Sequence, residues 1–503
     1  MKTETGSIVT RRSPGKARFI LLMSLVGAIP LRAQDAGDIT VAPMAIVRER
    51  TGITGAGWGA AFDVAGAGQT SRKVLNIYPN HPDDWGKTAG TGFSHSLDGG
   101  RTWVAGADNM PIAEMVDLWV DHLRGGELVA LGIRVLPDPK KPVEPGPDGI
   151  FKSVYALGVS SDQGTSWQMG TATVESSREI GPIARPLPHI LQERDGTWMM
   201  PAYSWGRKGS LALLLKSTDR GRNWRVAGTI ATAAAIKAMG VPVTTPWFEN
   251  MVVRTADGSL LAAIRTSSGA RGAVMVARSA DNGATWSAPE KLLVGPQQRI
   301  VPGKLPNLIL LRNGALVLLT AHTKNHCRIY VSWDGLGRTW SDGYVVTSQS
   351  GGNTSMVAID DNRLTVFTPA TGRISAWTVT VKPSGSSRGG SRAQSLAAPT
   401  AVRATPTPTG VALSWAAPAG GADVARYRIT SVLVKPADAD AEIYPYVPIE
   451  TADAATTVSL EKHFLAGAVY RFDVAAVDRA GRTSPVAPSG DVIVGAKAAA
   501  GVN

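Results

Sequence analysis

The chain has 503 residues, enough for more than one domain, and its hydrophobic content of 44% is ordinary for a globular protein. Its 55 glycines and 32 prolines suit many short strands joined by turns. The formal charge is +12, but the basic residues are scattered and no nucleic-acid-binding motif accompanies them, which excludes a nucleic-acid partner. A basic surface attracts acidic glycans or anionic headgroups, and equally it simply keeps a protein soluble.

Residues 1–33 are expected to be a secretory signal peptide. A positively charged region precedes the apolar run Phe19–Ile29, which is too short to span a bilayer, and Leu31–Ala33 is a plausible cleavage site. Arg11-Arg12 could form a twin-arginine signal, but Ser13-Pro14 follows it poorly, so general export is favoured. No other segment approaches transmembrane length. These features predict a secreted or periplasmic bacterial protein.

A single cysteine, Cys327, excludes an intramolecular disulfide and any cysteine-cluster metal site. An exported chain without disulfides fits a bacterial protein better than a disulfide-rich animal ectodomain. Cys327 lies in an apparent strand and is expected to be a buried small apolar residue rather than a nucleophile. No metal-ligand spacing is convincing, so we expect neither a metal nor another cofactor.

A short motif, Ser-x-Asp-x-Gly-x-Thr-Trp with Ser or Asn sometimes replacing Thr, occurs five times, and we call these segments the repeat turns. In a hairpin turn of this kind the Asp accepts backbone N–H groups, the Gly takes a positive φ and the Trp packs beneath the loop. The last copy has one extra residue before its second glycine. The copies are Ser96–Trp103, Ser160–Trp167, Ser217–Trp224, Ser279–Trp286 and Ser332–Trp340.

The repeat turns lie 53 to 64 residues apart, measured from Asp to Asp, which is the length of one four-stranded sheet per repeat. Successive sheets of that size build a β-propeller. The turns resemble the Asp-boxes, or bacterial neuraminidase repeats, of the sialidase superfamily, whose enzymes are six-bladed propellers. The resemblance implies that the box residues themselves are structural, because boxes lie on blade edges away from the site.

Apolar strands joined by Asp-Gly or Asn-Gly precede several of the repeat turns, and such dipeptides are strong hairpin signals. They occur at Asp195-Gly196, Asp257-Gly258 and Asn313-Gly314. A sixth unit, Met356–Phe367, has no repeat turn after it, and the first unit, from about Ile39, is irregular. We therefore predict an all-β, six-bladed β-propeller over residues 38–383.

The composition changes after Pro383. Residues 384–397 are rich in Gly and Ser and predict a flexible linker. Residues 398–495 resemble a fibronectin type III domain, a β-sandwich, through Trp415, the strand at Tyr427 and the alternating strand around Tyr470. Such a module usually acts as a spacer or a weak carbohydrate-proximal accessory and supplies no chemistry here.

The sialidase resemblance also implies a site at the propeller axis. There the family clamps a substrate carboxylate with three arginines, uses a Tyr nucleophile assisted by a Glu, and uses an Asp as general acid/base. Glu249 and Arg265 match the family's Glu and middle Arg, although they could equally form a structural salt bridge. Arg48 is the nearest substitute for the missing first Arg motif. Asp83 or Asp84 would supply the general acid/base. The alternative is that their loop is a solvated polar turn without a catalytic role.

One departure from the family pattern concerns the nucleophile. Where the family has Tyr-Ser before the last inner strand, this chain has Thr354-Ser355. A Thr hydroxyl is far less acidic than a phenol and cannot replace it. Other polar residues are predicted at equivalent inner positions, and each histidine among them could equally be structural. They are Asp117, Arg185, His189, Tyr203, Trp205, His322 and Lys324.

Three hypotheses follow. The first is a secreted sialidase-like exo-glycoside hydrolase acting on sialic or uronic acid-containing glycans through Glu249, Arg265 and one of Asp83, Asp84 or Asp117. The second is a polysaccharide lyase or another glycosidase that uses His189, Tyr203 and His322 on the same scaffold, with His as the base. The third is a non-catalytic glycan-binding propeller. We expect an acidic glycan as partner, no membrane span and a monomer.

Overall fold

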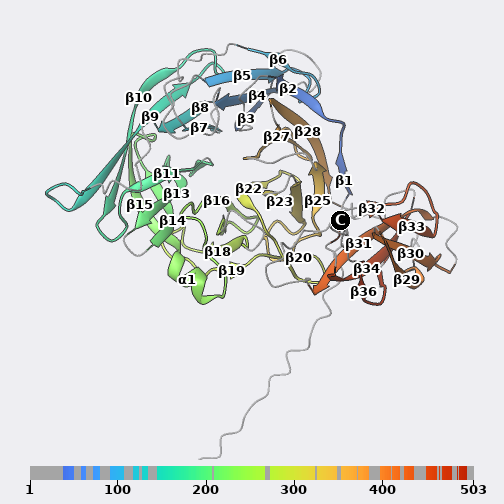
Figure 1. Ribbon diagram of the computed structural model, residues 1–503. Helices are drawn as coiled ribbons and strands as arrows, with labels where there is room; N and C mark the ends of the chain where they lie inside the picture. The colour runs from blue at the N-terminus through green and yellow to red at the C-terminus, as the bar shows by residue number, and fades with distance from the viewer. Residues whose placement is uncertain are drawn as a thin grey trace, which may run out of the picture. The chain divides into compact units, whose positions relative to one another are not determined.

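The computed structural model shows a nearly all-β protein (Figure 1). All described residues belong to one compact unit, 36–503. The structure describes residues 38–49, 58–63, 72–79, 91–106, 117–123, 127–133, 144–187, 189–206, 209–266, 272–322, 326–347, 353–370, 372–383, 397–408, 410–419, 424–435, 449–460, 464, 467–478, 484 and 486–495. The predicted signal peptide and almost all of the predicted linker therefore lie outside the described residues.

Three antiparallel sheets of four strands each follow the simple order of the chain. Their first strands are β3 (Trp58–Asp63), β16 (Asn250–Arg254) and β22 (Lys304–Leu310). The remaining strands are β4 (Arg72–Pro79), β5 (Thr91–Ser96), β6 (Val104–Ala105), β17 (Leu260–Ile264), β18 (Met275–Ser279), β19 (Glu290–Lys291), β23 (Leu316–His322), β24 (His326–Ser332) and β25 (Tyr344–Thr347). A small two-stranded sheet, β20 (Leu293–Val294) with β21 (Arg299–Ile300), lies in sequence between the sheet that begins with β16 and the sheet that begins with β22.

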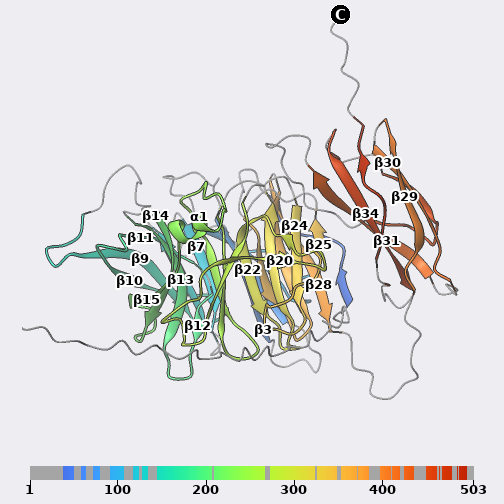
Figure 2. The same cartoon turned by 90° about the horizontal axis from the view of Figure 1, so that it is seen from below.

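A nine-stranded sheet contains two further repeats, joined where β10 and β15 pair in parallel from Thr173 to Glu175. Its first half is β7 (Asp117–His122), β8 (Leu128–Ile133), β9 (Ile150–Ser160) and β10 (Gln168–Ser177). Its second half is β11 (Ile183–Pro186), β12 (Leu191–Gln192), β13 (Trp198–Gly206), β14 (Gly209–Ser217) and β15 (Asn223–Thr232). The only helix of the described residues, α1 (Ala233–Ala238), follows β15, and the Thr232 hydroxyl caps it by accepting from Ala235 N at 3.0 Å. Figure 2 shows α1 beside β14.

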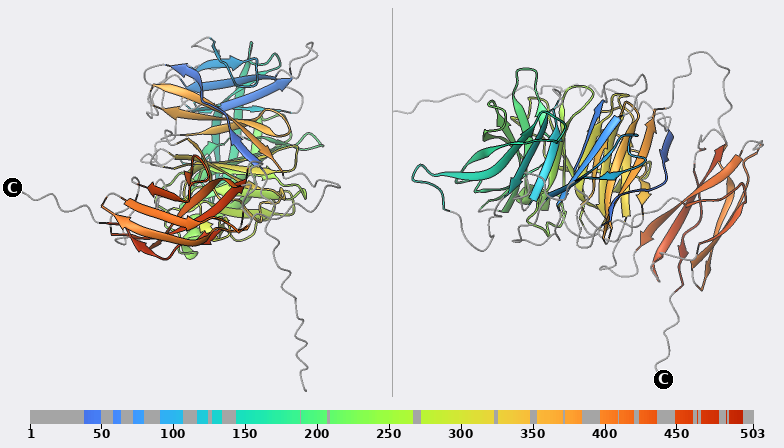
Figure 3. Two further views of the ribbon diagram at one scale, coloured as in Figure 1. Left: turned by 90° about the vertical axis from the view of Figure 1, so that its right-hand side faces the viewer. Right: turned by 90° about the horizontal axis from the view of Figure 1, so that it is seen from above.

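The last propeller sheet combines both ends of the predicted propeller. It contains β26 (Ser355–Ala358), β27 (Arg363–Ala370) and β28 (Arg373–Lys382), and β28 also pairs with β1 (Asp38–Val41) and β2 (Ala45–Glu49). Figure 3 shows these blue and orange strands together. The expectation that the first unit begins near Ile39 is therefore wrong: Asp38–Glu49 belong to the last sheet, because their backbone hydrogen bonds are made with β28.

The sheets are arranged as a propeller. Neighbouring sheets contact each other through strands near a common centre (Figure 1). On one side β3 contacts both β26 and β7. On the other side β13 contacts β16, β16 contacts β22, and β22 contacts β26. Apolar side chains fill the spaces between neighbouring sheets. One such core combines Leu187, Tyr203 and Leu214 with Val252 and Leu260. The propeller class is thus confirmed, while the number six for its blades stays a prediction from the repeats.

The repeat turns have the predicted conformation. In the turn at Asp281, the Asp281 carboxylate accepts from Thr285 N at 2.9 Å and from the Thr285 hydroxyl at 2.6 Å, and the Ser279 hydroxyl accepts from Gly283 N at 2.8 Å. Gly283 has a φ of 82°, and the indole of Trp286 donates to its carbonyl at 3.1 Å. The Trp-to-Gly contact recurs in every repeat turn. The motif therefore closes each hairpin on itself.

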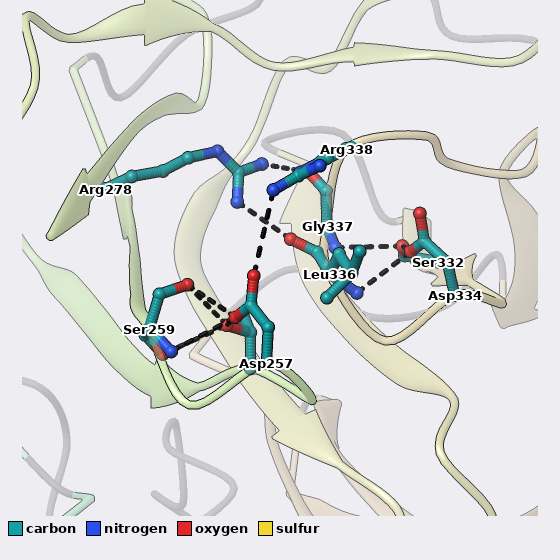
Figure 4. A network of polar contacts seen from close by, with 9 residues as sticks. Asp257, Ser259, Arg278, Ser332, Asp334, Leu336, Gly337 and Arg338 are labelled. Atoms are coloured by element: carbon teal, nitrogen blue, oxygen red, sulfur yellow. Dashed lines mark hydrogen bonds and ion pairs between the residues drawn. The ribbon is translucent and has the colours of Figure 1, made fainter. Parts of the chain in front are cut away.

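The turns also join neighbouring sheets. Arg278 of β18 donates to the carbonyl oxygens of Leu336, at 2.7 Å, and of Gly337, at 2.5 Å, in the fifth repeat turn (Figure 4). Asp257, from the turn between β16 and β17, forms an ion pair with Arg338 at 3.7 Å. The extra residue of the fifth turn lies in the segment that accepts these contacts, so that turn is both a hairpin and a contact between two sheets.

The C-terminal residues form two antiparallel sheets that enclose a separate core. One contains β29 (Thr400–Thr407), β30 (Gly410–Ala416) and β33 (Thr457–Leu460). The other contains β31 (Val424–Lys435), β32 (Ile449–Glu450), β34 (Val469–Asp478), β35 (Ala487–Pro488) and β36 (Val492–Ile493). Trp415 lies edge-on to Tyr427 with a centroid separation of 5.0 Å, inside this core. A β-sandwich is therefore present, and the fibronectin type III assignment remains a resemblance.

Candidate functional site

Glu249 and Arg265 meet at one end of the hairpin formed by β16 and β17. Glu249 directly precedes β16 and Arg265 directly follows β17, and the register that pairs Asn250 with Ile264 places them opposite each other. The backbone N–H of Arg265 donates to the Glu249 carbonyl at 2.8 Å. The structure thus brings together the two residues that the sequence analysis singled out, and their role as site residues stays a prediction.

A second arginine reaches Glu249 from the neighbouring sheet. Arg265 Nη1 donates to Glu249 Oε2 at 2.5 Å, while Arg185 Nη1, from β11, lies 3.6 Å from Glu249 Oε1. The three side chains are only 6–10% exposed. Each carboxylate oxygen thus faces one guanidinium in a buried setting, where electrostatic attraction is stronger than in water.

Trp247 completes this group of side chains. The Arg265 guanidinium carbon lies 5.8 Å from the centroid of the Trp247 ring, within the range of a cation–π contact. Trp247 is half-buried and packs against the apolar core between the two sheets. We call Arg185, Trp247, Glu249 and Arg265 the Glu249 cluster.

Tyr203 lies across the strand pair from Arg185. In the register of β11 and β13 the two residues are direct partners, so their side chains lie on the same face of the sheet. Tyr203 is buried, and its ring centroid lies 6.4 Å from that of the half-buried Trp205. Arg185, Tyr203 and Trp205 therefore lie in one sheet, and Arg185 is the member that contacts Glu249. Their roles as site residues stay predictions.

Asn250 fixes the backbone beside Glu249. Its side-chain amide donates to Ala202 O on β13 at 2.8 Å and to Phe248 O at 3.0 Å. One amide therefore ties the start of β16 to the neighbouring sheet. Asn307, at the corresponding place in β22, donates in the same way to Leu305 O and Thr354 O. The Asn250 contact with Ala202 thus fixes the chain beside Glu249 against the neighbouring sheet.

His189 follows β11 with a φ of 80°, a left-handed conformation that is uncommon for a residue other than glycine. It is half-buried and two residues beyond Leu187, which belongs to the core shared with Tyr203. Such backbone strain occurs at functional sites more often than elsewhere. His189 therefore stays a candidate, four residues after Arg185 in the chain.

Arg48 is a half-buried residue of β2, paired with Ile374 of β28, and so belongs to the last propeller sheet. Asp117 begins β7 and His322 ends β23, but their side chains are outside the described part of the structure. Asp83, Asp84 and Lys324 lie outside the described residues altogether. The predictions for these residues stay predictions.

Thr354 is buried and takes part in a backbone contact between two sheets. It is 1% exposed, immediately precedes β26, and its carbonyl accepts from Asn307 Nδ2 at 3.1 Å. Neighbouring Cys327 is fully buried, and this burial raises the pKa of its thiol, as expected for an unreactive cysteine. The Thr354 position therefore offers no replacement for a phenolic nucleophile.

Two residues of interest were not predicted. Trp247 precedes Glu249 by two positions, and this proximity was the signal available for it. Arg328 is 5% exposed within β24, and burial lowers its pKa below the usual range. A charged residue inside a largely apolar strand was the signal in that case.

Over the described residues, no group of three or more His, Cys, Asp or Glu could bind a metal, and no helix is long and apolar enough to cross a membrane.

The ring of sheets and the repeat turns define a β-propeller of the BNR-repeat type. Residues 142–391 match the family described as BNR repeat-like domain, which covers the Glu249 cluster and four of the repeat turns. Comparison with curated proteins gives no significant match.

Several solved structures resemble the chain at 12% sequence identity. The Penicillium chrysogenum α-L-arabinanase complexed with arabinobiose has a TM-score of 0.44 and covers 67% of this chain and 98% of its own. NanB sialidase from Streptococcus pneumoniae has a TM-score of 0.45, covering 71% and 72%. Trypanosoma rangeli sialidase in complex with sialic acid has a TM-score of 0.41, covering 92% and 91%.

Proposed function

We propose that this protein is a glycoside hydrolase that acts on acidic glycans, and that the Glu249 cluster binds the carboxylate of a sialic or uronic acid. The observation that carries the proposal is the Glu249 carboxylate held between the buried guanidinium groups of Arg185 and Arg265. A guanidinium has five N–H donors in a fork that matches a carboxylate, so an arginine paired with Glu249 can bind a substrate carboxylate as well.

The best candidate for the reacting group is Tyr203, because it is the strand partner of Arg185 and Thr354 cannot act as a nucleophile. In hydrolysis by this route, Glu249 accepts the phenol proton of Tyr203, whose oxygen forms a bond to the anomeric carbon while the glycosidic oxygen leaves and takes a proton from an acid. Water then replaces the phenolate. The proton would come from Asp83, Asp84 or Asp117, as the sequence predicts.

The backbone conformation of His189, beside the pair of Arg185 and Tyr203, favours a second candidate, a uronate lyase. Tyr203 and Arg185 are direct register partners, and His189 follows the same strand on strained backbone. In such a lyase Arg185 binds the uronate carboxylate and His189 or Tyr203 removes the C5 proton. The C4–O4 bond then breaks, O4 leaves with a proton from the other of these two residues, and a C4–C5 double bond remains.

Incubation of the purified protein with sialosides and with uronic-acid oligosaccharides separates these functions. Released sugar without a new ultraviolet absorbance supports hydrolysis, whereas absorbance from an unsaturated product supports the lyase. Binding without turnover would exclude both and favour a glycan-binding propeller. Arg265→Ala should abolish binding of acidic sugars, while Arg225→Ala, at a side chain that is 84% exposed, should leave it unchanged. Equal binding by Arg265→Ala and the unmodified protein would refute the carboxylate clamp.

We further propose that the protein is exported, on the basis of its signal-like first 33 residues. Fractionation of an expressing bacterium, with sequencing of the N-terminus of the mature chain, tests this. Cleavage before Gln34 would support export, and a chain retained in the cytoplasm with its N-terminus intact would contradict it.

A further inference from the structure

We propose that Trp247 is a positioning residue that sets the direction of the Arg265 guanidinium and thereby determines selectivity for carboxylated over neutral sugars. The inference rests on the proposed function, because it assigns a part to a residue of the same site. It goes beyond that function by assigning selectivity to an aromatic ring that does not itself bind the carboxylate.

The first step concerns three of the contacts that hold Arg265. Its backbone N–H donates to Glu249 O, its guanidinium binds Glu249 Oε2, and the guanidinium carbon lies 5.8 Å from the centroid of the Trp247 ring. The backbone bond fixes where the side chain starts, and the carboxylate fixes one end of the fork. The ring lies against the guanidinium and restrains its plane.

The second step concerns Trp247 itself, whose position is fixed by the surrounding chain. The Ser210 hydroxyl on β14 donates to the carbonyl of Pro246 at 2.8 Å, and Trp247 N donates to the Thr245 hydroxyl at 3.2 Å. The Trp247 ring packs on the core between the two sheets. The backbone bonds fix where the side chain starts and the core supports the ring, so Trp247 is a rigid support.

The third step concerns competition for Arg265. Glu249 is contacted by two arginines, closely by Arg265 and at 3.6 Å by Arg185. An incoming carboxylate would also compete with Glu249 for the Arg265 N–H groups. A guanidinium restrained only by Glu249 could turn with either carboxylate. Contact with Trp247 keeps its plane constant, so one orientation of a sugar carboxylate is favoured.

The test compares Trp247→Leu with Trp247→Phe. Binding of N-acetylneuraminic acid, D-glucuronic acid and neutral D-glucose to the full chain is measured by calorimetry or ligand-observed NMR. Since cation–π contacts are modest, Trp247→Leu should weaken binding of the acids by about 5- to 30-fold. Glucose binding should change little, so the ratio of acid to neutral affinity falls. Trp247→Phe keeps an aromatic face and should restore most of that ratio.

Trp333→Leu serves as the matched control, because Trp333, the second residue of the fifth repeat turn, is also partly buried but packs against a different core. It should leave the acid-to-neutral ratio unchanged, and thermal unfolding of each variant shows whether it is folded. If the unmodified protein binds neither acid, the proposed function fails and this inference fails with it. If it binds the acids and Trp247→Leu keeps the same ratio, only the inference is overturned. Equal losses in Trp247→Leu and Trp247→Phe would also overturn it.

Discussion

Arg265 binds Glu249 twice, once through the backbone and once through the side chain. Its N–H donates to the Glu249 carbonyl at 2.8 Å, and its guanidinium Nη1 donates to Glu249 Oε2 at 2.5 Å. The first bond continues the ladder between β16 and β17, and the second is an ion pair at the end of that ladder. The secondary structure of the hairpin therefore fixes the geometry of the charged pair.

Glu249→Gln should destabilise the fold because it removes the charge that two buried arginines share. Loss of one partner from a buried ion pair costs about 3 kcal/mol, since the remaining charge stays buried without compensation. Urea unfolding of the variant and the unmodified protein measures the free energy of unfolding. Glu127→Gln is the control, because Glu127 pairs with Arg220, whose side chain is 65% exposed. A solvent-exposed pair contributes less than about 1 kcal/mol. Equal effects of both substitutions would contradict the role given to Glu249.

The pairing of Glu249 with Arg265 could be predicted from sequence, because each lies eight residues from Asp257, the centre of the Asp-Gly hairpin. The repeat turns were predictable for the same reason: the contacts that close each hairpin lie within a few residues. The contact of Arg185 with Glu249 was not, since it joins two sheets and depends on how they pack. Nor was the pairing of Asp38–Val41 with Val379–Lys382, because the partners are more than 300 residues apart and no local signal specifies their register.

Gly258 and Gly283 have nearly the same backbone conformation but different surroundings. Alanine substitutions at the two positions therefore distinguish the cost of backbone strain from the cost of steric overlap. Gly258 has a φ of +84° and no atom within 4 Å of the place that a Cβ would take, whereas Gly283 has a φ of +82° and a Cβ there would lie 2.2 Å from Leu214 Cδ2. Gly258→Ala should cost about 1 kcal/mol for the left-handed conformation alone. Gly283→Ala should cost roughly 1–3 kcal/mol more, because it overpacks the space between two sheets. Similar unfolding free energies for the two variants would contradict this account of the fourth repeat turn.

The repeat turns should make the fold sensitive to acid. Hydrogen bonds from the Ser166 hydroxyl and backbone, and then from Ser160, lower the pKa of Asp162 to about 2. The pKa of Asp281 is lowered to about 2 in the same way by Thr285 and Ser279. An unfolded Asp titrates near about 3.9. The unfolded chain therefore binds protons first, and stability that is fully present above about pH 5 is lost as the pH falls toward 2.

Asp281→Asn tests this dependence, because the amide keeps the shape of the side chain but does not titrate. The variant should be less stable than the unmodified protein at pH 6, and its stability should fall less between pH 5 and 3. Urea midpoints across that range provide the measurement. Asp453→Asn, in the C-terminal sandwich, is a control outside the repeat turns. An Asp281→Asn variant with the same pH dependence as the unmodified protein would show that this turn does not contribute to acid sensitivity.

Tyr203→Phe should separate catalysis from binding at the Glu249 cluster. The substitution removes only the phenolic oxygen, so acidic sugars should still bind, while kcat should fall by about 10²- to 10⁴-fold, the usual contribution of a reacting acid or base. Tyr155→Phe is the matched control: Tyr155 is also buried, and its hydroxyl donates to the carbonyl of Ile183 at 2.7 Å. That variant should lose about 1 kcal/mol of stability and keep its kcat, because the lost hydrogen bond is to backbone rather than to substrate. Steady-state kinetics on whichever acidic glycan proves to be turned over gives kcat and KM for both variants. Unchanged kcat in Tyr203→Phe would remove Tyr203 from the reaction and leave His189 as the candidate from the same sheet.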